Sequence, residues 1–176
     1  MTIHQSEREI ITHAADYLTK HGFLSATGGN ISVRVAGQPL MAITPSNYDY
    51  QKMAPQDICI LNLEAEVQDA RLKPSVESGM HASIYKTRPD VQAIIHTHQV
   101  YPSTLAIINK PIPALFDEQV RFLGRSIDII PYAPSGTGML KNKVAKFVGN
   151  HHNAYMMANH GALVFGDSME RAIHNV

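Results

Sequence analysis

Residues 31–44, Ile-Ser-Val-Arg-Val-Ala-Gly-Gln-Pro-Leu-Met-Ala-Ile-Thr, predict two β-strands joined by a short turn. Apolar side chains alternate with polar ones from Ile31 to Val35, which is the period of a strand with one buried face. The stretch Gly37–Pro39 has the composition of a turn, and an extended apolar pattern resumes at Leu40. Because parallel neighbours need a crossover of about a dozen residues or more, so short a connection predicts an antiparallel pair.

Other predicted strands follow one another just as closely, and helical patterns separate the rest. The apolar runs 154–158 and 162–165 are split only by Asn159, His160 and Gly161. We also predict strands at 57–63, 91–97 and 127–131, with a possible short strand in the polar connection 64–73. Helices are predicted at 6–21, 76–88, 103–109, 137–149 and from about residue 168, with Ser6 and Glu9 as a capping box for the first. This order favours an α/β fold in which helices flank a mixed or mainly antiparallel sheet.

The composition limits the classes of partner. The chain has 176 residues, a length typical of one globular domain. Its 15 lysine and arginine residues balance 15 aspartate and glutamate residues, which argues against nucleic acid or an anionic membrane as a partner. Apolar stretches stay shorter than the roughly 18 to 20 residues that span a bilayer. The single cysteine, Cys59, lies in an apolar run and is expected to be a buried thiol, so we expect a cytoplasmic protein.

Ten histidines are the most distinctive feature of the composition. His96 and His98 end a predicted strand, where a spacing of two places both rings on one face and lets them share a metal ion. His160 follows an apolar strand beside Gly161 and is the best candidate for a third ligand. Glu77, near the start of a helix, could supply a carboxylate, because the positive end of the helix dipole favours an anion. Each of these residues alone has an ordinary interpretation, as a packed histidine or a helix N-terminal acid.

The remaining histidines near these motifs have weaker claims to the site. His81 is one helical turn after Glu77 and is either a partner of a metal ligand or a plain packing residue. His151 and His152 follow a helix end and are expected to cap it at the surface, so neither is assigned to the site.

Three polar turns carry groups that could hold a phosphate. In Thr27-Gly28-Gly29-Asn30, just before the first strand, adjacent glycines let backbone amides converge on an anion. The hydroxyl-rich turn Thr44-Pro45-Ser46-Asn47 lies at a strand end, and Ser75 lies at a helix start. A glycine pair is most often an ordinary turn, so the phosphate site requires these three turns to meet in space.

Taken together, five motifs resemble the class II aldolase/adducin family, and most closely its L-fuculose-phosphate aldolases. The motifs are Thr27–Arg34, Ile43–Ser46, Lys73–Glu77, Ile95–His98 and Ala158–Gly161, in this order and spacing. The resemblance runs from about Glu7 to the last residue. It implies a three-layer α/β/α sandwich with a mainly antiparallel central sheet, as a single domain over residues 1–176 that is shortened at its C-terminus. It also implies a homotetramer with active sites at the subunit borders.

The resemblance further implies a zinc enzyme that acts on a sugar phosphate. His96, His98 and His160 would ligate the ion together with Glu77, which would then act as a base, and Mn²⁺, Co²⁺ or Fe²⁺ could replace zinc. Thr27, Asn30, Thr44 and Ser75 would hold the phosphate. The implied reaction is cleavage of a ketose 1-phosphate to dihydroxyacetone phosphate and an aldehyde through an enediolate held by the metal. The alternatives are a pentulose-phosphate 4-epimerase, a dehydratase, a sugar-acid-phosphate decarboxylase and a non-catalytic adducin-like scaffold.

The sequence departs from the fuculose-phosphate aldolase pattern in three places. In the turns expected to hold the phosphate, Val76 replaces a serine and Asn47 replaces a glycine. One hydroxyl is therefore lost, and so is one close approach of the backbone to the phosphate. Asp117 or Glu118 stands about where these aldolases have a tyrosine that donates a proton from a neighbouring subunit. An acid in that region is more typical of the related sugar-phosphate epimerases, and it makes Asp117 and Glu118 candidate catalytic residues.

Overall fold

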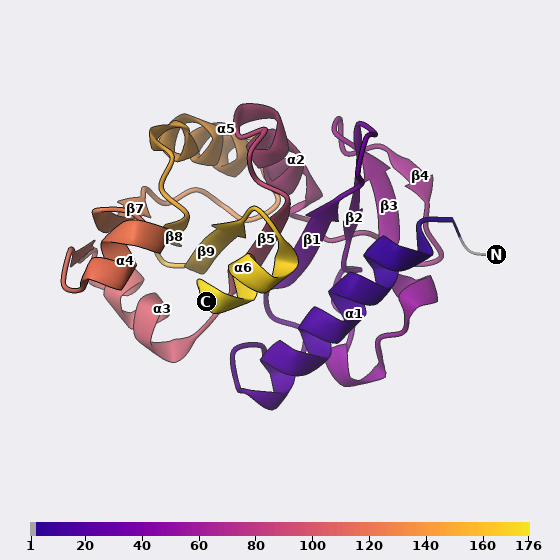
Figure 1. Ribbon diagram of the computed structural model, residues 1–176, viewed down its shortest axis with the longest axis horizontal. Helices are drawn as coiled ribbons and strands as arrows, with labels where there is room; N and C mark the ends of the chain where they lie inside the picture. Colours follow the sequence, from indigo (N-terminus) through magenta and orange to yellow (C-terminus); the bar gives the residue numbers. More distant parts are fainter. Residues whose placement is uncertain (1–2) are drawn as a thin grey trace.

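The computed structural model describes residues 3–176 and centres on a nine-stranded sheet in the order β4-β3-β2-β1-β5-β9-β8-β7-β6 (Figure 1). Its strands are β1 (Asn30–Arg34), β2 (Leu40–Ile43), β3 (Cys59–Asn62), β4 (Val67–Asp69), β5 (Ala93–Thr97), β6 (Ile112–Pro113), β7 (Ser126–Ile130), β8 (Ala154–Met157) and β9 (Gly161–Gly166). Neighbouring strands in the described chain are antiparallel, except that β7 and β8 are parallel. The predicted hairpin is confirmed, since β1 pairs with β2.

Helices cover both faces of the sheet (Figure 1). They are α1 (Gln5–Lys20), α2 (Ser78–Thr87), α3 (Val100–Ile107), α4 (Asp117–Phe122), α5 (Gly138–Phe147) and α6 (Met169–His174), with 3-10 turns at Tyr50–Lys52, Pro55–Asp57 and Val148–Asn150. Helices α1 and α6 share one apolar core with the sheet, whereas α2 and α5 share a second core on the opposite face. The structure therefore confirms the expected three-layer α/β/α sandwich.

Strand β5 shows how the sheet separates the two cores. Ala93 and Ile95 pack under α1 and α6, whereas Ile94 between them packs under α2 and α5. Both faces of the strand are buried, which explains the apolar run at Ala93–Ile95. By the same alternation His96, next but one to Ile94, lies on the α2 side of the sheet.

The longest helix in the described chain is α1, with 16 residues. It buries one face, including Ile11, Ala15 and Leu18, and exposes the other. Across residues 3–176, we find no helix that is both long and apolar enough to cross a membrane.

Some local predictions were wrong. Ser6 does not cap α1, because the helix already begins at Gln5 and the Ser6 hydroxyl donates to Glu7 within the first turn. Helix α2 begins at Ser78 rather than near residue 76, because the preceding residues form a turn in which the amide of Ser78 donates to the carbonyl of Ser75. Helix α4 was not predicted. None of its six residues is buried, so it has no apolar face for a periodicity to reveal.

Candidate active site

The sheet topology brings together the ends of three central strands, β1, β5 and β9, which are distant in the sequence. Strand β5 pairs antiparallel with both β1 and β9, so its end lies beside the start of each neighbour. In the register of these pairs, Asn30 lies opposite His96 and Ala162 lies opposite Thr97. The end of β5, which carries His96 and leads to His98, therefore lies beside His160, which directly precedes β9.

The three histidine rings and Glu77 form one cluster. Nε2 of His98 lies 3.0 Å from Nε2 of His96, and the rings of His96 and His160 have centroids 4.7 Å apart. One nitrogen from each ring falls within 4.8 Å of the others. Glu77 closes the cluster, with Oε2 3.4 Å from Nε2 of His96 and Oε1 3.3 Å from Nε2 of His160. The four residues predicted as metal ligands are thus neighbours in space.

This donor set fits a divalent metal ion. Nδ1 of His96 lies 2.7 Å from the carbonyl oxygen of Ala162, which can only accept, so Nδ1 carries the proton and the lone pair of Nε2 faces the cluster. Ligands at roughly 2.0 to 2.1 Å from a tetrahedral zinc ion are about 3.4 Å from one another. The contacts within the cluster, 3.0, 3.3 and 3.4 Å, are close to that separation. His96, His98, His160 and Glu77 can therefore hold such an ion.

The ionisation states in the cluster also suit a cation. Desolvation lowers the pKa of His96 and of His98, which favours the neutral rings that a metal requires. Burial by itself would raise the pKa of Glu77. The neighbouring rings of His96 and His160, with hydrogen bonds from Asn30 and Ser135, outweigh burial and lower that pKa, so Glu77 is a carboxylate at neutral pH.

Gly29 and Gly161 allow the starts of β1 and β9 to lie close to the end of β5. At Gly29, φ is +81°, and a Cβ atom would lie 2.3 Å from the carbonyl oxygen of His96. At Gly161, a Cβ atom would lie 2.3 Å from the carbonyl oxygen of Thr97 and 2.9 Å from the ring of His98. A larger residue at either position would displace the end of β5, so these glycines help to set the positions of the two histidines.

A cleft of about 140 Å³ adjoins the cluster and collects most of the residues predicted to bind phosphate. Its lining consists of Thr27, Gly28, Gly29, Asn30, Pro45, Ser46, Asn47, Ser75, Val76, Glu77, His98, Ser135 and His160. Two of the polar turns are joined by backbone hydrogen bonds, from Ser46 N to the Lys73 carbonyl and from Ser75 N to the Thr44 carbonyl. Thr44 itself does not line the cleft. It is fully buried, and its hydroxyl accepts a hydrogen bond from the amide of Ile31.

Asn47 and Val76, the two departures from the family pattern in the turns predicted to bind phosphate, have different effects on the cleft. Asn47 has a φ of 54°, a left-handed conformation that asparagine tolerates better than most residues, so the turn keeps a glycine-like backbone. Val76 is 55% exposed and presents an apolar side chain to the cleft. The cleft therefore lacks a hydroxyl at position 76 but keeps its backbone shape at position 47.

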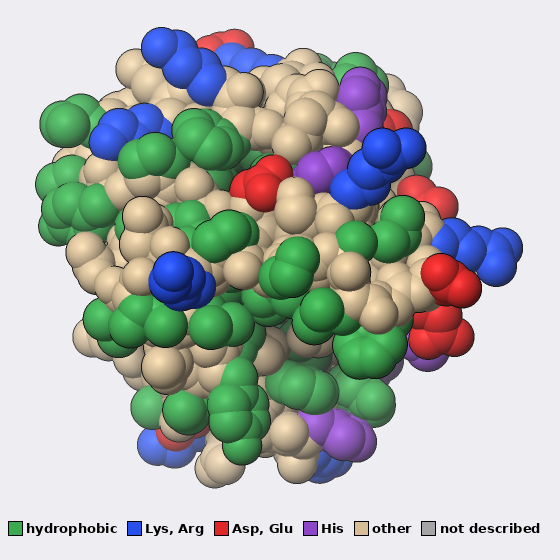
Figure 2. Space-filling model, turned by 90° about the vertical axis from the view of Figure 1, so that its left-hand side faces the viewer, with side chains coloured by type: hydrophobic (Ala, Val, Ile, Leu, Met, Phe, Trp, Pro, Cys, Tyr) green, Lys and Arg blue, Asp and Glu red, His purple; other side chains and the backbone are tan. Residues whose placement is uncertain are grey.

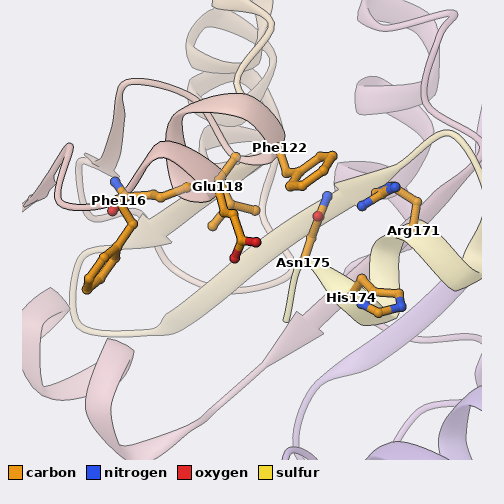
Figure 3. Close-up of a pocket in the computed structure, with 8 residues that line it drawn as sticks. Phe116, Glu118, Phe122, Arg171, His174 and Asn175 are labelled. Carbon is orange, nitrogen blue, oxygen red and sulfur yellow. The ribbon is translucent and has the colours of Figure 1, made fainter.

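Asp117 and Glu118 lie at the start of α4, apart from this cleft. Glu118 lines a groove of about 490 Å³ between α4 and α6, together with Phe122, Arg171 and His174 (Figure 3). Among the described residues, the lining of this groove and the lining of the histidine cleft have no member in common. Within one chain, the structure does not bring the two predicted proton donors to Glu77.

Ser135 was not predicted as a site residue, and two interpretations of His81 were left open. The Ser135 hydroxyl donates to Oε1 of Glu77 at 2.8 Å from the loop between β7 and α5, and only the turn composition around Pro134-Ser135-Gly136 could have drawn attention to it. His81 is fully buried and hydrogen-bonded rather than merely packed. Its Nε2 lies 2.5 Å from Oδ1 of Asn30, and its Nδ1 lies 2.6 Å from the hydroxyl of Ser32.

Comparison with known proteins gives matches along nearly the whole chain. The model of a family described as Class II Aldolase and Adducin N-terminal domain matches residues 9–176. A 5-deoxy-D-ribulose 1-phosphate aldolase of Bacillus thuringiensis serovar kurstaki is 36% identical over 169 residues, which are 96% of this chain and 78% of that protein. An L-fuculose phosphate aldolase of Escherichia coli O6:H1 is 33% identical over 166 residues, covering 94% of this chain and 75% of that protein. The solved structure of an L-fuculose 1-phosphate aldolase has a TM-score of 0.90 at 31% identity, covering 96% of this chain and 79% of that one.

Proposed function

This chain belongs to the class II aldolase and adducin family and is an enzyme of the class II aldolase type, and on that premise we propose that it cleaves a ketose 1-phosphate into dihydroxyacetone phosphate and an aldehyde. One observation carries the proposal. Three histidine nitrogens and a buried carboxylate converge beside a cleft that hydroxyl-rich turns help to line.

His96, His98, His160 and Glu77 would hold the metal ion, for which we propose zinc. When bound, a divalent ion supplies a Lewis acid that stabilises the negative charge developing on a carbonyl oxygen as a neighbouring carbon–carbon bond breaks. Imidazole and carboxylate donors accept Mn²⁺, Co²⁺ or Fe²⁺ as well, so the ligand set alone does not select one metal.

Glu77 is the residue we assign to proton transfer. It is 4% exposed, and hydrogen bonds from Asn30 to Oε2 and from Ser135 to Oε1 hold it in place. The carboxylate would accept the proton of the substrate hydroxyl whose carbon becomes the aldehyde. The electron pair of the broken carbon–carbon bond stays with the fragment that bears the phosphate. That fragment then takes up a proton at carbon and leaves as dihydroxyacetone phosphate.

The substrate phosphate would bind at the far side of the same cleft. The backbone of Gly28 and Gly29 and the hydroxyls of Thr27, Ser46 and Ser75 are the groups we assign to it, since all five residues line the cleft. The Asn30 amide already bonds to Glu77 and His81, so only its second N–H is left for a phosphate oxygen.

Release of dihydroxyacetone phosphate is the direct test. Zinc-loaded protein should produce it from 5-deoxyribulose 1-phosphate, from fuculose 1-phosphate, or from both, in an assay coupled to reduction of the ketone product. An isomeric sugar phosphate without any aldehyde would identify an epimerase instead. Loss of water or carbon dioxide would identify a dehydratase or a decarboxylase, and no turnover by fully loaded protein would favour a scaffold.

We also propose that the chain forms a homotetramer with active sites at the subunit borders. Large apolar side chains are exposed along α3 and the segment that leads into α4, namely Val100, Tyr101, Ile107, Ile108, Leu115 and Phe116. Figure 2 shows many hydrophobic side chains on the side of the molecule that carries these elements. Exposed apolar surface of this kind is typical of subunit interfaces. From there, Asp117 or Glu118 could act as proton donor in the cleft of a neighbouring subunit.

Light scattering on purified protein should therefore give about four times the mass of one chain. Tyr101→Lys combined with Phe116→Lys should shift the mass toward the monomer and reduce kcat at the same time, because the shared sites would be broken. A wild-type monomer that still turns over substrate would contradict both the tetramer and the role of the two acids.

A further inference from the structure

A buried row of hydrogen bonds leads away from Glu77 between α2 and β1. Glu77 is the N-cap residue of α2, and His81 and Tyr85 follow it at intervals of four residues, while Asn30 and Ser32 are two residues apart on β1. Four helical residues rise about 6 Å and two strand residues about 6.6 Å, so the two sets of side chains stay in step. The resulting contacts are Asn30 Nδ2 to Glu77 Oε2 at 2.8 Å, Asn30 Oδ1 to His81 Nε2 at 2.5 Å, Ser32 Oγ to His81 Nδ1 at 2.6 Å and Ser32 Oγ to the Tyr85 hydroxyl at 2.8 Å.

Every donor in this row points toward Glu77. A carboxylate can only accept, so Nδ2 of Asn30 donates to Glu77 and Oδ1 of Asn30 faces His81. Since Oδ1 is an acceptor, the proton of the neutral ring is on Nε2 of His81, and Nδ1 accepts from the Ser32 hydroxyl. The single hydroxyl proton of Ser32 is then used, so the hydroxyl of Tyr85 donates to Ser32.

The surroundings keep the His81 ring neutral, with its proton on Nε2. The ring is fully buried, and desolvation lowers its pKa to about 3, although the charge of Glu77 acts in the opposite direction. Both ring nitrogens have partners, so the tautomer and the ring orientation are fixed together. Without the hydrogen bond from His81 to Oδ1, the Asn30 amide could rotate by 180°. Its oxygen would then face the carboxylate of Glu77, and the two acceptors would repel each other.

We propose that His81 is a positioning residue for the aldol reaction, because through Asn30 it fixes the orientation of the Glu77 carboxylate. This inference rests on the proposed function of Glu77 as the proton-transfer group. In the fixed orientation Oε2 faces His96, and Oε1 faces His160 and Ser135. His81 does not touch the substrate cleft, so its effect reaches the reaction through hydrogen bonds alone.

Three variants on α2 separate this role from packing. His81→Leu fills a similar volume but removes both hydrogen bonds, and it should lower kcat by about 10- to 100-fold while KM and zinc content stay near the wild-type values. His81→Gln places an amide N–H near the position of Nε2 and should recover most of kcat. Ser83→Ala is the control. It removes a buried hydroxyl of the same helix that donates to the Met80 carbonyl, so kcat should not change.

Side-chain ¹⁵N NMR of histidine-labelled protein gives a readout that does not depend on activity. The ring signals that disappear in His81→Gln should show a proton on Nε2 and a bare Nδ1 throughout roughly pH 5 to pH 8, the range in which free histidines titrate. This measurement and His81→Gln decide the question even if His81→Leu is too unstable to purify.

Several outcomes would overturn the inference. They are a proton on Nδ1 of His81, wild-type kcat in His81→Leu, a kcat in His81→Gln that is as low as in His81→Leu, or a parallel loss of zinc. If the wild-type enzyme cleaves no ketose phosphate while the NMR spectrum shows the expected tautomer, the proposed reaction is wrong but the hydrogen-bonded row is correct.

Discussion

Replacing Glu77 by glutamine should lower kcat by about 10²- to 10⁴-fold, the usual contribution of one positioned acid or base. Glutamine keeps the size of the side chain but cannot accept the substrate proton. The nitrogens of His96, His98 and His160 remain within 4.8 Å of one another, so zinc content should stay near one ion per chain. Metal analysis and kcat for release of dihydroxyacetone phosphate, measured on the same sample, test both parts of the prediction.

The matched control is Glu64→Gln, the same chemical change at an exposed carboxylate. Glu64 pairs with Lys86 at 2.6 Å on the surface, and an exposed ion pair contributes little to folding, so this variant should behave like the wild-type enzyme. If Glu77→Gln loses zinc and activity in equal measure, Glu77 acts mainly as a metal ligand and the base must be another group.

Local patterns were enough to predict the parts of the site that depend on strand geometry. The period of two placed His96 and His98 on one face, and their Nε2 atoms indeed lie 3.0 Å apart although His98 is one residue beyond the end of β5. Short turns also predicted the antiparallel neighbours, whereas the close approach of Gly29 and Gly161 to the end of β5 was not predicted.

Contacts between distant segments could not be predicted in this way. No periodicity specifies that Ser135 will reach Glu77 across 58 residues, or that Asn30 will bond to it across 47. Asn30 is instructive, because the sequence motif suggested a phosphate ligand while the fold also uses its amide to hold Glu77. The resemblance to a family supplied the candidate metal ligands, but the hydrogen bonds around Glu77 became visible only in three dimensions.

Replacing His98 by alanine should remove the metal and the activity together. Changes to groups that only support a metal ligand cost about 10- to 100-fold, so loss of a direct ligand should weaken zinc binding by more than about 100-fold. His98 is a better choice than His96 for this test. His98 is exposed, whereas His96 is fully buried, so alanine at position 98 leaves no cavity in the core that could destabilise the fold.

The control is His13→Ala, which removes an exposed histidine of α1 that is not part of the cluster. Wild-type enzyme and this control should lose activity on treatment with a chelator and regain it when zinc is added, while His98→Ala should regain none at the same zinc concentration. Thermal unfolding of the zinc-free proteins separates the loss of a ligand from damage to the fold. A damaged fold would change the unfolding transition of His98→Ala, whereas the loss of a ligand alone would not. If His98→Ala retains one zinc ion per chain and normal kcat, then His96, His160 and Glu77 hold the metal without it, and His98 serves the substrate or the neighbouring glycine turn instead.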